Sequence, residues 1–159
     1  MGKGETVSVK APSGTRRRTR QTPPAYVLDT QVGFVLRQVA QRHTTIFTSR
    51  MGEDITATQW AALSKLFEKG PCSQNLLGRL TAMDAATIKG VVDRLVKRAL
   101  VETRPDPEDG RRLVVGLTAE GAAFAERAIP LAREITEETL APLDAGEQAQ
   151  FLALLERLK

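Results

Sequence analysis

A short acidic turn, DPEDGRR at residues 106–112, separates two runs of strand-forming residues in a chain whose other patterned segments have helical spacing. The two runs are LVETR at 100–104 and RLVVGLT at 112–118. Short runs of this kind, joined by a turn that contains proline and glycine, predict a β-hairpin. We therefore expect a mainly α-helical chain with one small β-hairpin.

Helical periodicity, with apolar residues every three or four positions, begins at Tyr26 and gives a first helix over residues 26–52. A second helix is predicted over 56–70, where Thr56 and Gln59 can form a capping box and Gly70 precedes the proline that ends the helix. Its apolar face is predicted to hold Trp60, Leu63 and Phe67.

Two shorter helices follow, separated by a tight turn. QNLLGRLT at 74–81 is preceded by the candidate N-cap Ser73, and AATIKGVVDRLVKRAL at 85–100 is preceded by Asp84. Two short helices joined by a turn are typical of a helix-turn-helix, and a hairpin directly after one is a wing. Residues 56–118 therefore predict a winged helix-turn-helix.

The last part of the chain predicts two more helices. The first begins after Thr118 and should be kinked at Pro130, and the second opens with a capping box of Asp144 and Glu147. The terminal segments, residues 26–52 and 119–158, have more apolar surface than a monomer could cover. We expect these helices to pair two chains in a homodimer.

Charge and composition exclude several classes of protein. The first 22 residues hold six Lys and Arg residues and one Glu, in a chain of net charge +4. They are expected to be a disordered basic tail before a domain at 23–159, and RRRTR either contacts phosphates or is solvated. No run approaches the ~20 apolar residues of a membrane span, so we expect a cytoplasmic protein.

Catalysis and metal binding have little support in the sequence. The chain has one cysteine and one histidine, without a glycine-rich phosphate loop or a paired-carboxylate motif. We expect no enzyme activity, no cofactor and no metal site. Cys72 beside Pro71 is predicted at a helix entrance, where its pKa would be lowered; redox sensing and a simple half-buried turn residue are both open interpretations.

Several polar residues have the placement expected of DNA contacts. The outward residues early in helix 85–100 can approach base edges, and those at the start of helix 74–81 can approach phosphates. Arg94 and Lys97 either contact DNA or pair with Asp93. The candidate base readers are Ala86, Thr87, Lys89 and Gly90, and the candidate phosphate contacts are Gln74 and Asn75. A winged helix that binds another protein is the alternative.

The stretch DPEDGRRLVVGLTAEG resembles the wing of the MarR family of bacterial transcription regulators, with matches at Asp109, Arg111, Leu117, Thr118 and Gly121. The resemblance covers roughly residues 26–159. It implies a homodimer on a pseudo-palindromic operator in double-stranded DNA. It also implies that Asp109 orients Arg111 toward the minor groove, while Arg112 contacts a phosphate. A surface ion pair without a DNA role is the other interpretation.

The same resemblance implies a small aromatic carboxylate as effector, bound between the dimer helices and the DNA-binding lobe. His43, Phe47 and Trp60 are expected to line that place, or else to be core residues. YVLDTQVGFVLRQVAQRHTTIF is also similar to the first helix of MarR-type repressors of nicotinate degradation. This similarity implies 6-hydroxynicotinic acid as the effector.

Overall fold

The structure is a computed structural model that describes residues 1, 25–52, 54–107, 109–110 and 112–159. The basic tail predicted at residues 1–22 lies outside the described residues except for Met1, and Arg111 lies outside them too.

The described chain is mainly α-helical with one small antiparallel sheet, as the sequence predicts. A 3₁₀ turn, η1, and six α-helices account for most of it. These are η1 (Leu28–Thr30), α1 (Val32–Met51), α2 (Ala57–Lys69), α3 (Gln74–Leu80), α4 (Ala85–Lys97), α5 (Ala119–Leu140) and α6 (Ala145–Glu156). The strands are β1 (Cys72–Ser73), β2 (Val101–Pro105) and β3 (Leu113–Leu117), in the order β1-β3-β2.

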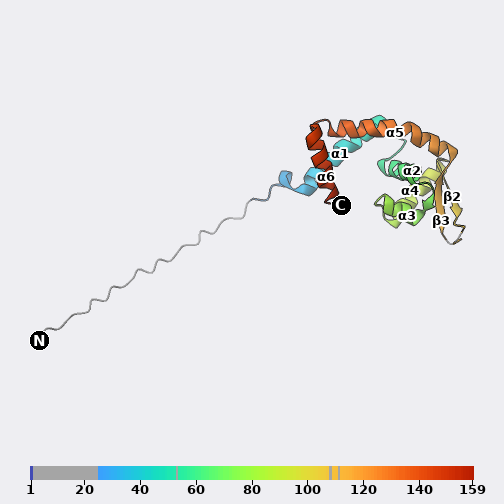
Figure 1. Cartoon of the computed structure of the whole chain (residues 1–159), viewed down its shortest axis with the longest axis horizontal. Helices are drawn as coiled ribbons and strands as arrows, with labels where there is room; N and C mark the ends of the chain where they lie inside the picture. Colours follow the sequence, from blue (N-terminus) through green and yellow to red (C-terminus); the bar gives the residue numbers. More distant parts are fainter. Residues whose placement is uncertain (2–24, 53, 108, 111) are drawn as a thin grey trace.

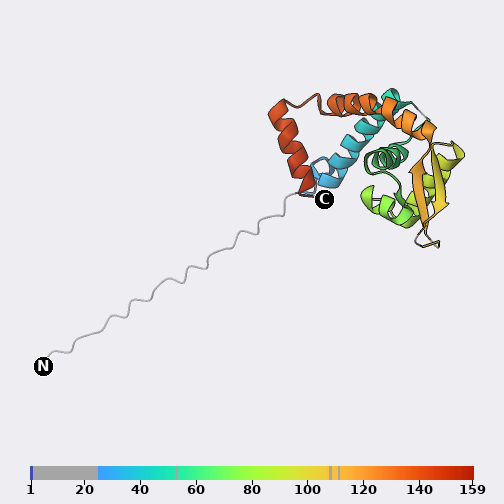
Figure 2. The same cartoon turned by 45° about the vertical axis from the view of Figure 1, so that its right-hand side comes forward.

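Two parts of the molecule are visible in Figures 1 and 2. Helices α2, α3 and α4 and the sheet form a lobe, and α1, α5 and α6 form an elongated layer of helices beside it. Helix α5 runs from the lobe to the far end of the layer. There the C-terminus lies close to the beginning of α1 in both views.

The predicted caps set the beginnings of the helices in the lobe. Thr56 and Gln59 form the capping box of α2. Ser73 Oγ accepts a hydrogen bond from the backbone N–H of Leu76, at 3.3 Å. Asp84 Oδ1 accepts one from the N–H of Thr87 at 2.7 Å. Each cap satisfies an N–H that has no partner within its own helix, so the local sequence fixes where the helix-turn-helix begins and turns.

The first and second helices differ from prediction in detail. Thr30 and Gln31 both donate side-chain hydrogen bonds to the Val27 carbonyl, at 2.9 Å each. These bonds hold residues 28–30 in a separate 3₁₀ turn, so α1 begins later than residue 26. In α2 the buried face is Gln59, Ala62, Leu63 and Leu66, whereas Phe67 is 43% exposed.

The core lies between α2, α3, α4 and the sheet and extends to Ile46 and Phe47 of α1 and Ile135 of α5. Its largest fully buried side chains are Leu63, Leu77, Ile88, Val91, Val92, Leu95 and Val115. By contrast, apolar residues are exposed along the outer layer. They are Val32, Val35, Leu36 and Val39 on α1 and Leu152, Leu154 and Leu158 at the C-terminal end. Helix α6 buries no residue within its own chain. The terminal helices thus leave the apolar surface that the sequence predicts for dimerisation.

Helix α5 is joined closely to the lobe at its first turn. Thr118 Oγ1 donates to the carbonyl of Ala99 at 2.7 Å, and the Thr118 N–H donates to the carbonyl of Leu100 at 3.2 Å. One turn later, a Cβ on Gly121 would lie 1.8 Å from the Leu100 carbonyl oxygen. Only glycine permits this approach, and the approach fixes where α5 leaves the wing. Further along, α5 continues through Pro130 to Leu140.

Candidate nucleic-acid interface

The outer face of α4 presents the residues that the sequence predicts as base readers. Ala86, Thr87 and Lys89 are exposed and Gly90 is half-buried, while the opposite face of the helix lies in the core. The backbone N–H and the hydroxyl of Thr87 bond to Asp84, which lowers the pKa of that carboxyl. The first turn of α4 is therefore held in place with its short side chains pointing outward.

Lys89 is paired within α4. Its Nζ lies 2.6 Å from Asp93 Oδ2, and the Lys89 side chain is 65% exposed. The sequence left Arg94 and Lys97 as candidate partners of Asp93, but in the structure the ion-pair partner of Asp93 is Lys89. The Arg94 guanidinium instead folds back over Gly90, 3.6 Å from where a Cβ on that glycine would stand. Lys89 and Arg94 thus both lie on the exposed side of α4, and Lys97 at the end of the helix is exposed as well.

The wing is a hairpin in which Val101 pairs with Leu117 and Pro105 with Leu113. At its tip the backbone N–H of Arg112 donates to the Asp109 carbonyl at 2.8 Å, and Arg112 Nε lies 3.2 Å from Asp109 Oδ2. Asp109 therefore holds a wing guanidinium, that of Arg112. The pairing with Arg111 that the resemblance implies falls on a residue outside the described ones.

A third strand, β1, was not predicted. Cys72 pairs with Val115 and Ser73 with Val114, so β1 joins the start of α3 to the wing. This arrangement brings Gln74 and Asn75 close to Arg112. Together these residues line a hollow of about 400 Å³, which is completed by Ser73, Arg79 and Leu113.

The three residues predicted for effector binding do not line one hollow. Phe47 is 5% exposed and belongs to the core. His43 Nδ1 lies 2.9 Å from Thr139 Oγ1. Because the Thr139 hydroxyl donates to the Ile135 carbonyl at 2.7 Å, it accepts from His43, whose Nδ1 therefore carries a proton.

Trp60 lines a hollow of about 370 Å³ between α2 and α5. Its other walls are Ser64, Ile129, Ala132, Arg133, Thr136 and Glu137. The sequence did not single out these residues, because Arg133, Thr136 and Glu137 are polar, exposed positions of a long amphipathic helix and the others are ordinary half-buried positions. The signal that could have found them is their i, i+4 spacing beside the seam of α5.

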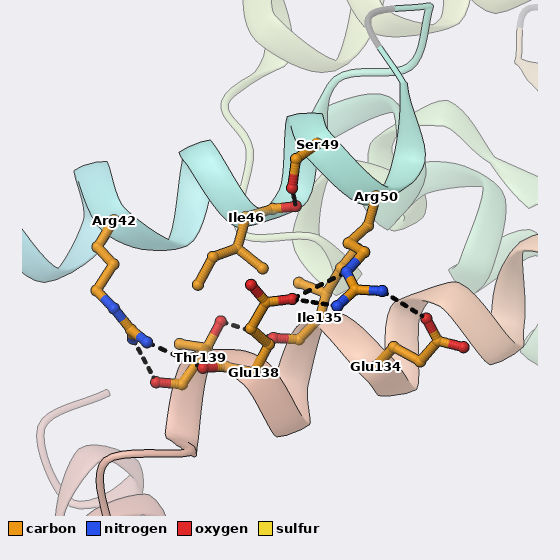
Figure 3. Close-up of polar contacts among 8 residues, drawn as sticks. All are labelled: Arg42, Ile46, Ser49, Arg50, Glu134, Ile135, Glu138 and Thr139. Carbon is orange, nitrogen blue, oxygen red and sulfur yellow. Dashed lines mark hydrogen bonds and ion pairs between the residues drawn. The ribbon is translucent and has the colours of Figure 1, made fainter.

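Helices α1 and α5 are held together by polar contacts as well as by packing (Figure 3). The Arg42 guanidinium donates to the backbone carbonyls of Glu138 and Thr139. Arg50 lies 2.7 Å from Glu138 and 3.3 Å from Glu134, and the hydrogen bond to Glu138 is the main cause that raises the pKa of Arg50. These contacts set the angle of α1 against the far half of α5.

Comparison with known proteins decides the family. Residues 55–113 match the MarR family. Over 134 residues the chain is 43% identical to the HTH-type transcriptional repressor NicR of Pseudomonas putida, covering 84% of this chain and 85% of that protein. The chain belongs to the MarR family. It is accordingly a transcription regulator with a DNA-binding winged helix, as the wing residues indicated.

Two solved structures of MarR-like fold have a similar backbone. A probable transcriptional regulator from Pseudomonas aeruginosa is 55% identical, with a TM-score of 0.82, covering 84% of this chain and all of that one. BpsR of Bordetella bronchiseptica is 36% identical with a TM-score of 0.81, covering 84% and 96%. The DNA binding of BpsR is regulated by 6-hydroxynicotinic acid.

Cys72 does not have the surroundings of a reactive thiol in this MarR-family chain. It lies in β1, directly before Ser73, the N-cap of α3, so it does stand at a helix entrance as predicted, but its side chain is half-buried. Burial raises the pKa of the thiol above its ordinary value, which corrects the lowered pKa expected from the sequence. Little thiolate is present at neutral pH, and thiolate is the form that reacts.

The raised pKa of the half-buried Cys72 thiol leads to a prediction about oxidation. The parent protein and Cys72→Ser are expected to keep the same affinity for operator DNA after treatment with hydrogen peroxide, because the thiol stays protonated. The measurement is fluorescence anisotropy of a labelled duplex before and after oxidation. Release of DNA from the parent but not from Cys72→Ser would establish redox sensing.

No group of three or more His, Cys, Asp or Glu residues among the described residues could hold a metal ion. Within the same part of the chain, no helix is long and apolar enough to cross a membrane.

Proposed function

We propose that this protein is a transcriptional repressor that binds a pseudo-palindromic operator as a homodimer and is released by a small aromatic acid. The observation that carries the proposal is the exposed face of α4, with Thr87 and Lys89, on the same lobe as the wing. In both views the ends of β2 and β3 that face the hairpin turn lie at the same end of the lobe as α3, the helix that packs on α4 (Figures 1 and 2). One duplex can then meet the recognition helix and the wing together.

In this proposal α4 enters the major groove. Lys89 donates to guanine acceptors, the hydroxyl or methyl of Thr87 contacts a base edge, and the small Ala86 and Gly90 let the helix approach closely. Arg94 contacts the backbone beside Gly90. The wing places Arg111 in the minor groove, while Asp109 keeps its neighbour Arg112 beside the phosphates.

The homodimer follows from the uncovered apolar surface. The exposed Val32, Val35, Leu36 and Val39 belong to the first half of α1. The beginning of this helix lies at the end of the molecule to which α6 and the C-terminus return (Figures 1 and 2). A second copy related by a two-fold axis would cover both surfaces at once. It would also place two α4 helices at a fixed separation, as two half-sites about one helical turn apart require.

We place the effector in the hollow between α2 and α5. Trp60 offers an aromatic face, Arg133 a guanidinium for a carboxylate, and Glu137 an acceptor for a ring N–H or hydroxyl. A hydroxylated pyridine carboxylate carries all three complementary features, and the similarity to NicR and BpsR favours 6-hydroxynicotinic acid. His43 and Phe47 would support the effector site indirectly, by holding α1 against α5.

An effector can release DNA only if it binds more tightly to the arrangement of lobes that does not fit the operator. We therefore expect 6-hydroxynicotinic acid to raise the melting temperature of the free protein and to weaken operator binding. At one hundred times its Kd the stabilisation is about 2.7 kcal/mol. Melting and anisotropy titrations, run on one protein preparation, measure the two effects.

Variants locate the effector site. Trp60→Ala and Arg133→Ala should reduce the melting shift and the release of DNA while leaving operator affinity without effector close to that of the parent. Arg127→Ala, which removes an exposed charge from the same helix outside the hollow, is the matched control and should respond like the parent. A melting shift of the parent size in Trp60→Ala and Arg133→Ala would place the effector elsewhere.

A further inference from the structure

We infer that the hollow between the start of α3 and the wing seats one phosphate of the DNA backbone, held between the guanidinium groups of Arg79 and Arg112. The inference rests on the proposed DNA binding and adds a residue, Arg79, that the sequence did not single out. Arg79 comes from α3 and Arg112 from the tip of the wing, directly before β3, and both line the same hollow of about 400 Å³.

The lining has the chemistry that a phosphate needs. It contains two guanidinium groups, the amides of Gln74 and Asn75, and the hydroxyl of Ser73. No carboxylate lines this hollow among the described residues. A guanidinium has five N–H donors and binds phosphate oxygens in a planar, two-pronged manner. The hollow is therefore a concave cluster of donors with a net positive charge.

Arg112 is already oriented for this role. Its Nε is held 3.2 Å from Asp109 Oδ2, and its side chain is still 68% exposed. The Asp109 contact uses one edge of the guanidinium and leaves its other N–H groups available. Arg79 is exposed as well, and no salt bridge or side-chain hydrogen bond engages it within the described part of the chain. Neither guanidinium therefore has to break a buried ion pair before it can bind a phosphate.

The position of the hollow favours DNA as the source of the phosphate. Helix α3 packs on α4, with the Gly78 backbone against Ile88 and the Met83 carbonyl. Strand β1 ties the start of α3 to β3 of the wing through Ser73 and Val114. The hollow thus lies between the wing and α3, the helix that packs on the proposed major-groove helix α4. The sugar-phosphate backbone separates a major groove from the adjacent minor groove. A DNA strand that passes between α4 in the major groove and the wing in the minor groove would therefore run past this hollow.

A phosphate seated here would fix the register of the lobe on the duplex. Contacts to phosphates position a protein and carry no direct sequence information. Arg79 and Arg112 should therefore contribute to affinity for every duplex, with equal effect on good and poor operator sequences. Because they share one phosphate, their contributions should be coupled and not additive.

The experiment uses the full-length protein and the duplex that the parent enriches most strongly from a random library. Anisotropy titrations compare the parent with Arg79→Ala, Arg112→Ala, the double variant and the Arg127→Ala control, each first shown by melting to be folded. We expect each single variant to lose about tenfold or more in affinity and the double variant to lose less than the product of the two losses. The slope of log affinity against log salt should fall by about one for each half-site.

Single methylphosphonate substitutions, scanned along both strands, identify the phosphate. One position in each half-site should weaken binding by the parent but leave the double variant unaffected. Parent-like affinity of Arg79→Ala, a changed sequence preference, or methylphosphonate effects identical in parent and double variant would overturn the inference while leaving the proposed repressor function intact. If the parent enriches no sequence at all, both the phosphate seat and the proposed repressor function are contradicted.

One more titration separates DNA phosphate from the free anion. The parent without DNA is titrated with inorganic phosphate against chloride at constant ionic strength. We expect no saturable rise in melting temperature. A saturable rise that Arg79→Ala abolishes would assign the hollow to a free anion and overturn its assignment to the DNA backbone.

Discussion

Replacing Gly121 with alanine is expected to destabilise the protein by about 3 kcal/mol, at the upper end of what overpacking costs. The added Cβ would lie 1.8 Å from the carbonyl oxygen of Leu100 and 2.8 Å from its carbonyl carbon. Both are backbone atoms, so no side chain can turn away to make room. The first turn of α5 would have to move off the lobe, breaking the bonds from Thr118 to Ala99 and Leu100.

Thermal or urea denaturation measures this effect, and the expected fall in melting temperature is on the order of 10 °C. Gly33→Ala in α1 is the matched control, because no atom lies within 4 Å of a Cβ at that position. The control should be neutral or slightly stabilising, since alanine favours a helix more than glycine does. Equal melting temperatures for Gly121→Ala and the parent would show that α5 does not approach the lobe so closely.

Lys89→Ala is expected to weaken operator binding by about 1 to 3 kcal/mol, which corresponds to roughly five- to 150-fold in affinity. The ammonium group is the strongest donor among the predicted base readers of α4. In the free protein it lies 2.6 Å from Asp93 Oδ2, so it must leave that carboxylate to reach a base. Asp93→Asn should therefore have the opposite effect, because it releases Lys89 and removes a negative charge that faces the phosphates.

Anisotropy titrations with the selected operator and with an unrelated duplex measure both variants. Lys89→Ala should lose more affinity for the operator than for the unrelated duplex, whereas Asp93→Asn should gain on both. Equal losses on the two duplexes would make Lys89 a phosphate contact. Unchanged affinity of Lys89→Ala for both would remove it from the interface.

Much of the lobe could be predicted from the sequence because its signals are local. The capping residues Thr56, Ser73 and Asp84 lie next to the backbone groups that they satisfy, and the acidic turn lies between its own two strands. Strand β1 could not be predicted in this way. It has two residues, and it exists only because Val114 and Val115, some forty positions later, pair with it.

The candidate sites also divide into features set by local sequence and features set by contacts between distant segments. The exposed face of α4 that we propose reads bases follows from helical spacing within one segment, and its exposed residues lie where that spacing puts them. The hollows depend on which segments meet. Trp60 faces α5 and so lies beside Arg133, whereas His43 is turned to Thr139 and Phe47 into the core. Helical spacing shows that these residues share faces, but it does not show which neighbouring helix each face meets.

The central claim, a homodimer that reads two half-sites of DNA, is tested most directly by selecting duplexes from a random library with the full-length protein. We expect an enriched inverted repeat whose half-sites are centred about 10 base pairs apart, or a multiple of a helical turn, bound by two chains per duplex. Binding should weaken steeply with salt. Enrichment of a single half-site by one chain, or no enrichment above the starting library at low salt, would contradict it.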